Sequence, residues 1–266
     1  MGAHVCDACG SHGLGLERVR YYSRQLISAD DMTVEQEYFR KKLRRHNRYL
    51  HGWGVVCGLE VKPMPEDGLP WQVRVCPGYA IGPQGDEIAV GEAVDFDLAT
   101  GASKPADPCA NVWPCPPTGR MPAPGRQASV YLAVRYTECD ARPERVHPAG
   151  CGCDESSCEY SRIRDAFELK VLWELPQSHK DAQAWDAAWL AQIAAWKASG
   201  SPGGTIPQPL PLPVPPCAAC PSDPWVVLAC IQLPPLATTP VQEAGITYKD
   251  RRVLYSVHAL RLFLGG

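Results

Sequence analysis

The sequence predicts an α+β protein with an antiparallel or mixed β core, a long basic N-terminal helix, a tryptophan-striped helix and long loops rich in cysteine and proline. Three observations predict this class. Apolar residues recur at helical spacing in an early segment, several later segments alternate or are rich in β-branched residues, and the 27 prolines and 23 glycines concentrate in a few loops. The 266 residues are 45% hydrophobic, which is enough for one large domain or two small ones.

The first expected helix begins near Ser28. Ser28 and Asp31 have the spacing of a capping box, Thr33 and Gln36 offer the same spacing, and Gly52 is placed to end the helix. A single apolar stripe runs along it, made of Met32, Phe39, Leu43, His46 and Leu50. We expect this stripe to be buried on the core, so that Phe39→Ala or Leu43→Ala costs about 2–5 kcal/mol.

The same helix is basic. Residues 35–48 hold six basic and two acidic residues, a local charge of +4, which leaves −7 for the rest because the whole chain carries −3. Three interpretations are open: a solvated helix face, pairing with acidic groups of this chain or a neighbour, or a phosphate-binding ridge. The candidate interface residues on this ridge are Arg40, Lys41, Arg44, Arg45 and Arg48.

Strand patterns follow the helix. Alternating or β-branched segments predict strands at 54–61, 71–76, 94–98, 129–137, 167–173 and 225–233, and a hairpin formed by 79–81 and 87–90. Residues 101–126 and 139–160 are expected to be long loops, and residues 250–264 a short terminal helix.

A second helix is expected at 180–199, with a capping box at Ser178 and Asp181. Its stripe contains Trp185, Trp189 and Trp196, which either pack in the core or form an assembly hot spot. A proline-rich connector follows. The expected organisation is an N-terminal extension (1–27), a main domain (28–176), the helix with its connector (177–224), and a C-terminal part (225–266) that completes the main domain.

Several segments resemble a family of largely uncharacterised bacterial proteins. They are LISADDMTVEQEYFRKK (26–42), HNRYLHGWGVVCGLEV (46–61), VRVCPGYAIGPQGDEIAV (73–90), YLAVRYTE (131–138), CGCDESSCEYSRIRDAFELKVLWELP (151–176), VVLACIQL (226–233) and DRRVLYSVHALRLFL (250–264). The family is associated with phage-tail-like particles and contractile injection systems, in the baseplate or fibre region. The resemblance implies a structural role among other tail or baseplate-like proteins and copies of itself.

The 13 cysteines are the main chemical feature, and their odd number excludes complete pairing within one chain. Those in strand patterns, Cys57, Cys76 and Cys230, are expected to act as small hydrophobes. One candidate structural zinc site combines Cys6, Cys9, Cys217 and Cys220, which have CxxC spacing. A second combines Cys151, Cys153 and Cys158 with Cys139 or His147. Disulfides and free thiols remain alternatives, although a reducing cytosol favours metal.

No motif for hydrolase, nucleotide-binding or metalloprotease chemistry is present, so the chain is not expected to be an enzyme. The alternatives are a zinc-dependent or thiol enzyme using the 139–160 loop, and a soluble ligand-binding adaptor. No export signal, polybasic tail or membrane-spanning run is visible. We therefore expect cytoplasmic synthesis, assembly into a particle that lysis releases, and neither nucleic-acid binding nor membrane insertion.

Overall fold

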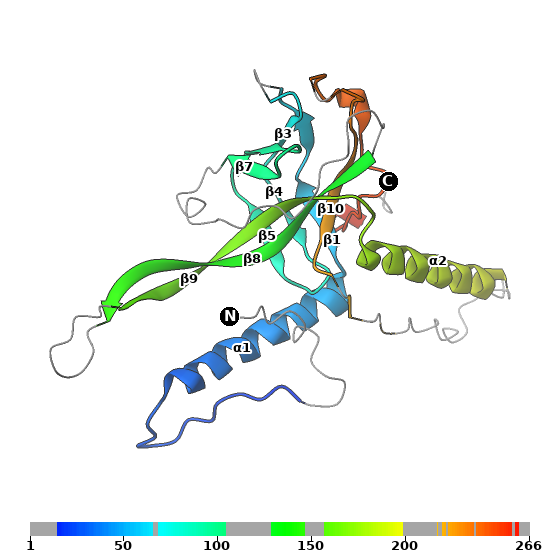
Figure 1. Ribbon diagram of the computed structural model, residues 1–266. Helices are drawn as coiled ribbons and strands as arrows, with labels where there is room; N and C mark the ends of the chain where they lie inside the picture. The colour runs from blue at the N-terminus through cyan, green and yellow to red at the C-terminus, as the bar shows by residue number, and fades with distance from the viewer. Residues whose placement is uncertain are drawn as a thin grey trace.

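The computed structural model describes residues 15–65, 69–104, 129–146, 157–198, 217, 220, 221, 223–236, 238–256, 259 and 260. The described residues form an α+β fold, which confirms the predicted class. Figure 1 shows small sheets gathered at the centre, from which one helix and a long hairpin extend to one side and a second helix to the other.

Three antiparallel sheets make up the described β structure. The first has the order β1-β4-β5, from β1 (Gly54–Gly58), β4 (Gly78–Ile81) and β5 (Glu87–Val90). The second has the order β2-β3-β6-β7, from β2 (Val61–Pro63), β3 (Gln72–Val75), β6 (Val94–Asp97) and β7 (Ala102–Lys104). The third has the order β11-β10-β8-β9, from β8 (Ser129–Val146), β9 (Ser157–Leu172), β10 (Val226–Gln232) and β11 (Ile246–Thr247).

The predicted hairpin of β4 and β5 is confirmed. The single strand predicted at 54–61 is instead two strands in two sheets. The chain turns between them at Gly58 and Leu59, which both have positive φ, 61° and 53°. Leu59 is nevertheless fully buried, so this turn also contributes to the core.

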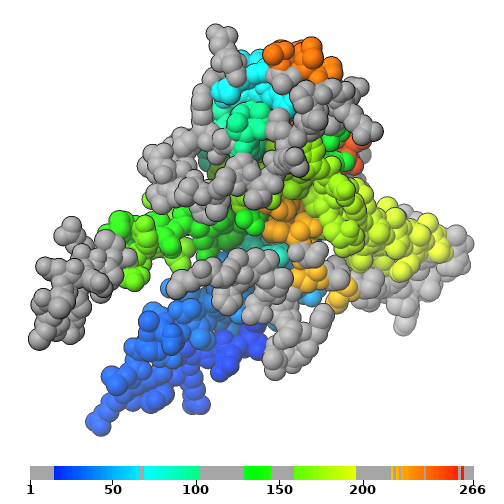
Figure 2. Space-filling model, viewed as in Figure 1, coloured from blue at the N-terminus to red at the C-terminus, as the bar shows by residue number. Residues whose placement is uncertain are grey.

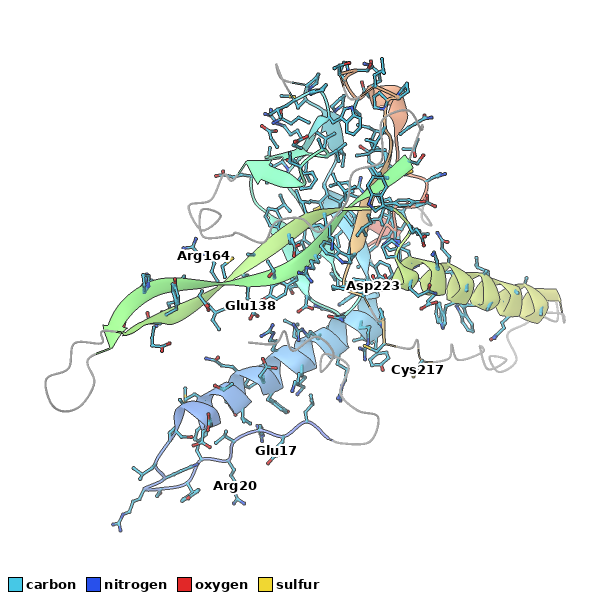
Figure 3. All side chains as sticks on the ribbon, viewed as in Figure 1. Glu17, Arg20, Glu138, Arg164, Cys217 and Asp223 are labelled. Carbon is cyan, nitrogen blue, oxygen red and sulfur yellow. The ribbon has the colours of Figure 1, made fainter. Side chains whose placement is uncertain are left out.

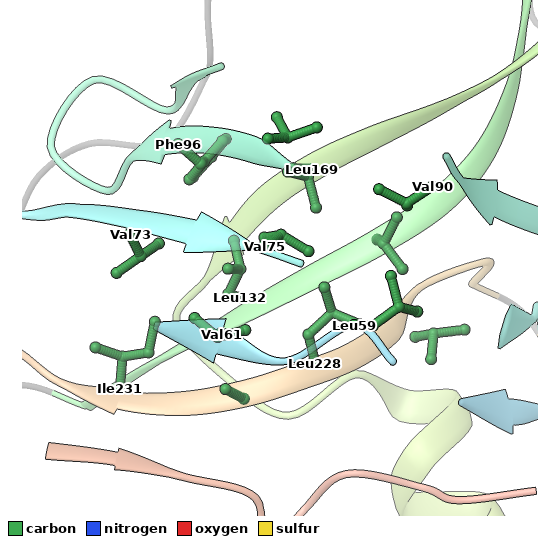
Figure 4. Packing of buried hydrophobic residues seen from close by; sticks show 14 of the residues in the cluster. Leu59, Val61, Val73, Val75, Val90, Phe96, Leu132, Leu169, Leu228 and Ile231 are labelled. Carbon is green, nitrogen blue, oxygen red and sulfur yellow. The ribbon is translucent and has the colours of Figure 1, made fainter. Parts of the chain in front are cut away.

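The hydrophobic core lies where the three sheets meet. Figure 4 shows Leu59 and Val61 facing Val75, Leu132 and Leu228 across this space. The largest fully buried apolar side chains are Phe96, Leu59, Ile88, Leu132, Leu228 and Ile231. They come from four strands (β5, β6, β8 and β10) and the β1–β2 turn, so burial of apolar area holds the sheets to one another.

The hairpin of β8 and β9 is longer than predicted. Residues 139–146 and 157–160, expected as loop, are paired strand. β10 pairs with β8 only from Ser129 to Val134, so beyond that point the hairpin is a two-stranded ribbon. Apolar and polar residues alternate along a strand when one face of the sheet packs on the core. Because this ribbon is exposed on both faces, its sequence is polar throughout and resembles that of a loop.

Helix α1 (Ala29–His46) begins with the predicted capping box. The Ser28 backbone donates to the Asp31 carboxylate at 2.9 Å, and the Asp31 backbone donates to the Ser28 hydroxyl at 3.1 Å. The helix continues into a π-helical turn, η2 (Asn47–His51).

The predicted burial of the apolar stripe of α1 is wrong. No residue of α1 is buried, and Met32, Phe39 and Leu43 are 48%, 57% and 50% exposed. The polar face of the helix lies against the body of the protein instead. Periodicity identifies the residues that share a face, but not the face that the fold covers.

Helix α2 (Gln177–Ala198) begins three residues earlier than predicted, so Ser178, the expected cap, lies inside its first turn. The Ser178 backbone and hydroxyl donate to the carboxylate of Asp223 at 2.9 and 2.7 Å. Figure 3 labels Asp223, which lies near the start of α2. Asp223 lies 45 residues further along the chain, so no local pattern could reveal this cap.

The terminal helix predicted at 250–264 is wrong for residues 250–256. Val253 forms a parallel bridge with Val55, whose backbone bonds to Arg252 and Leu254 at 2.8 Å each. Residues 259 and 260 are helical. None of the helices in the described part of the chain combines the length and the apolar character that crossing a membrane requires.

Candidate assembly surface

Two elements project from the core on the same side, helix α1 and the outer part of the β8–β9 hairpin (Figure 1). An isolated helix of this length and an isolated two-stranded ribbon are each only marginally stable in water. Both therefore depend on the contacts that fix them to the body.

The first contact joins α1 to the hairpin. The Arg40 guanidinium forms ion pairs with Glu138 of β8 and, at 3.2 Å, with Glu37 of its own helix. It also lies 5.8 Å from the centre of the Tyr136 ring. The Tyr136 hydroxyl lies 2.8 Å from Glu138 and 2.7 Å from Asp165, and burial together with these carboxylates raises the pKa of Tyr136, which stays a neutral phenol.

The second contact joins the end of α1 to the β4–β5 turn. Arg44 pairs with Asp86 at 2.5 Å, and the Asn47 side chain donates to the Gly85 carbonyl at 3.0 Å. Burial raises the pKa of Asp86, although the Arg44 charge opposes this shift. Gly85 has φ of 93°, and a Cβ there would lie 2.2 Å from the Arg44 carbonyl oxygen, so only glycine allows this approach.

The basic residues of the ridge therefore fall into two groups, and the first pairs with acidic groups of other elements. Arg40 and Arg44 pair with acidic groups of the same chain, one of the interpretations left open by the sequence. Lys41 lies 3.9 Å from Glu37, and the Arg48 guanidinium lies 4.7 Å from the Tyr49 ring centre. Arg45 is exposed.

The apolar residues of α1 form the candidate assembly surface. We define the α1 stripe as Met32, Phe39 and Leu43, extended by Leu50, which is 70% exposed in the π-helical turn. Figure 2 shows α1 in blue projecting from the central body. A continuous exposed apolar strip on a helix is typical of a protein–protein contact.

The tryptophan stripe is partly covered. Trp185 and Trp189 are half-buried and stack on each other, with ring centres 6.4 Å apart, and Leu190 beside them is 64% exposed. The side chain of Trp196 lies outside the described residues. Trp185 and Trp189 therefore each keep part of their surface accessible on α2.

The cysteines proposed as metal ligands are only partly described. Cys6, Cys9, His147, Cys151 and Cys153 lie outside the described residues. No group of three or more histidine, cysteine or acidic side chains among the described residues is arranged to hold a metal ion.

The described cysteines restrict both candidate sites. In the β8–β9 register, Cys139 lies opposite Arg164, and Cys158 lies six residues before Arg164 on β9. About 20 Å therefore separates Cys139 from Cys158 along the ribbon, so the two cysteines cannot bind the same ion. Cys220 is disulfide-bonded and Cys217 is a free thiol. Because zinc binds thiolates, the four-cysteine site requires reduced Cys220.

The strand cysteines differ from one another. Cys230 is buried, as expected of a small hydrophobe, but Cys76 is half-buried and Cys57 is exposed. Cys57 lines a shallow depression of about 640 Å³ between β1, β2 and the C-terminal segment. Arg251 in this depression donates to the carbonyls of Gly58 and Leu59 at 2.6 and 2.9 Å, so its charge serves to hold the chain together.

His179 is a buried histidine that the sequence pattern did not predict. His179 of α2 accepts from the Val227 backbone at 3.1 Å and packs edge-on to Trp53, with ring centres 4.7 Å apart. Burial lowers the pKa of His179 to about 4, so this histidine is neutral at pH 7. It joins α2 to β10 and packs on Trp53 within the core.

The chain matches no protein-family model and no curated protein. The geometry of the described residues therefore carries the functional argument, together with the resemblance drawn from the sequence motifs.

Proposed function

We propose that this chain is a structural subunit of a phage-tail-like or contractile injection particle, associated with the tail or baseplate, and that it acts through protein–protein contacts. One observation carries the proposal. Helix α1 is held by ion pairs on its polar face while its apolar stripe points to solvent. A monomer gains nothing from this orientation, whereas an assembled subunit buries the stripe.

The resemblance noted for 46–61 and the other motifs supports the choice of particle, because it concerns tail-associated proteins. The partners are then other tail or baseplate-like proteins and copies of this chain. Assembly takes place in the cytoplasm, and the particle leaves the cell on lysis. Structural zinc bound by the loop cysteines belongs to the same proposal, since such a site links the segments that supply its ligands and contributes folding free energy.

Sedimentation from the native host tests the proposal. A tagged chain is expected to sediment with particles visible by electron microscopy. Trp189→Ala is expected to reduce its incorporation while circular dichroism of the purified variant stays native, because a large aromatic at an interface centre contributes about 2–4 kcal/mol. Lys62→Ala, at an exposed site far from both helices in sequence, is the control and is expected to be incorporated normally.

An enzyme would behave differently. A chain that never co-purifies with a larger assembly, and that turns over a substrate which its Cys151→Ser or Cys153→Ser variant cannot, would contradict the structural role. The zinc-dependent or thiol enzyme would then take its place.

A further inference from the structure

The exposed face of α1 has the spacing of a helix–helix seam. Its positions 32, 36, 39, 43 and 46 follow one another in steps of four, three, four and three residues. This 3.5-residue repeat keeps one narrow strip of a helix facing a partner helix. Met32, Phe39 and His46 then occupy d positions of the heptad, and Gln36 and Leu43 occupy a positions.

We propose that α1 is a self-association helix, whose stripe packs in parallel against α1 of further copies of this chain around a symmetry axis. The inference rests on the proposed assembly role and names the partner at one of its surfaces. The occupant is a second copy of this chain.

The part of the chain that the structure describes leaves this strip open. The contacts of Arg40, Arg44 and Asn47 with the body all lie on one side of α1. On the other flank, the backbone of Val19 donates to the Glu35 carboxylate at 3.3 Å, so the segment before the helix touches that edge at one oxygen of Glu35. Between these flanks no described segment covers the seam, along a helix of 18 residues that is about 27 Å long.

The basic charge of α1 does not keep copies apart. Arg40 and Arg44 are paired with Glu138 and Asp86 of their own chain, and Lys41 lies near Glu37. These ion pairs neutralise the side of the helix that faces the body. The apolar strip can therefore approach its equivalent in another copy without strong repulsion from the ridge.

The charges beside the seam favour a parallel arrangement of identical helices. In a parallel pair each g position faces the e position of the next heptad, which sets Glu35 opposite Arg40 of the other copy and Lys42 opposite Asn47. Arg40 has five N–H donors, so it can pair with this carboxylate in addition to its own partners. In the antiparallel register that sets Phe39 opposite Leu43, Lys42 would face Lys42 and Arg40 would face Arg40, which is repulsive.

Sedimentation equilibrium of the purified full-length chain tests self-association. The wild type is expected to be oligomeric at micromolar concentration. The double variant Phe39→Glu/Leu43→Glu is expected to weaken association by about a hundredfold or more, because four or more charges would enter the seam. Val34→Glu is the matched control: Val34 is also exposed on α1 but occupies the outermost f position, so this variant is expected to associate like the wild type.

Two charge variants test the orientation. Glu35→Lys is expected to weaken association several-fold at low salt, because it sets a lysine opposite Arg40 of the other copy, and the effect should shrink at high salt. Lys42→Glu is expected to change association little. The reverse result, no effect of Glu35→Lys and tighter association of Lys42→Glu, would overturn the parallel arrangement.

The inference fails independently of the proposed function. A wild-type chain that is monomeric at tens of micromolar, or an oligomer that survives Phe39→Glu/Leu43→Glu, overturns self-association through α1. If such a chain still enters a particle, another protein covers the stripe and the assembly role stands. If the chain self-associates through α1 but enters no particle, the proposed function fails and this inference stands.

Discussion

At the residue scale, His179 shows how burial controls a charge. Burial lowers its pKa to about 4, whereas the unfolded value is near 6.5. Between these values the unfolded chain binds more protons than the folded one, so the free energy of unfolding increases with pH. The contribution of His179 is complete above about pH 6.5 and is lost as the pH falls towards 4, an effect of about 3 kcal/mol.

We therefore expect the urea midpoint of the wild type to fall between pH 7 and pH 4.5 by more than that of His179→Gln, whose amide can still accept from Val227. Asp86, whose pKa is raised, contributes in the opposite direction in both proteins, so the difference between them isolates His179. Parallel pH profiles for the two proteins would show that His179 is charged or exposed.

Two adjacent arginines provide a second residue-scale prediction. The Arg44 side chain is 14% exposed and paired with Asp86, whereas Arg45 is exposed. Arg44→Ala leaves a largely buried carboxylate without its cation and is expected to cost about 2–3 kcal/mol. Arg45→Ala is expected to cost under about 0.5 kcal/mol. Urea unfolding measures both, and equal losses would mean that Arg44 is solvated.

At the element scale, α1 contributes little apolar burial within one chain. Measured where the protein is monomeric, Phe39→Ala is expected to cost under about 1 kcal/mol because the side chain is more than half exposed. Leu228→Ala in the fully buried part of β10 is expected to cost about 2–5 kcal/mol. Thermal melts at low protein concentration decide this, and a comparable loss for Phe39→Ala would restore the buried stripe.

An element could be predicted when the residues that specify it are neighbours in the sequence. The capping box of α1, the β4–β5 hairpin and β10 are specified by neighbouring residues, and the sequence patterns identify them. The α2 cap depends on Asp223, and the outer hairpin on pairing between residues up to 33 apart. Neither partner is visible in a local window.

For the same reason, the sequence predicts which residues form the α1 stripe but not that the stripe is exposed. The heptad spacing of the α1 stripe is a property of adjacent turns and can be read directly. Its exposure depends on Arg40 and Arg44 finding Glu138 and Asp86, which lie 98 and 42 residues further along the chain. Burial of a helix face is thus a tertiary result that a polar contact at the opposite face can reverse.

At the scale of the whole molecule, the state of the cysteines tells whether zinc or disulfides cross-link the long loops. We expect near-stoichiometric zinc in protein purified without chelator under reducing conditions, bound by the loop cysteines other than Cys139. Elemental analysis measures it. Mass spectrometry that finds these cysteines oxidised in pairs, in a metal-free protein, would show that disulfides such as the one at Cys220 hold the loops instead.

The position of β10 has a consequence for synthesis. β10 is a late segment of the chain, yet it lies between β11 and β8 at the centre of its sheet and contributes Leu228 and Ile231 to the core. During translation the native core therefore cannot close until residues 226–232 leave the ribosome. Until then the edge of β8 stays unpaired while α1 has already emerged, so a nascent chain on a polysome offers its self-association helix to its neighbours before its own body is folded.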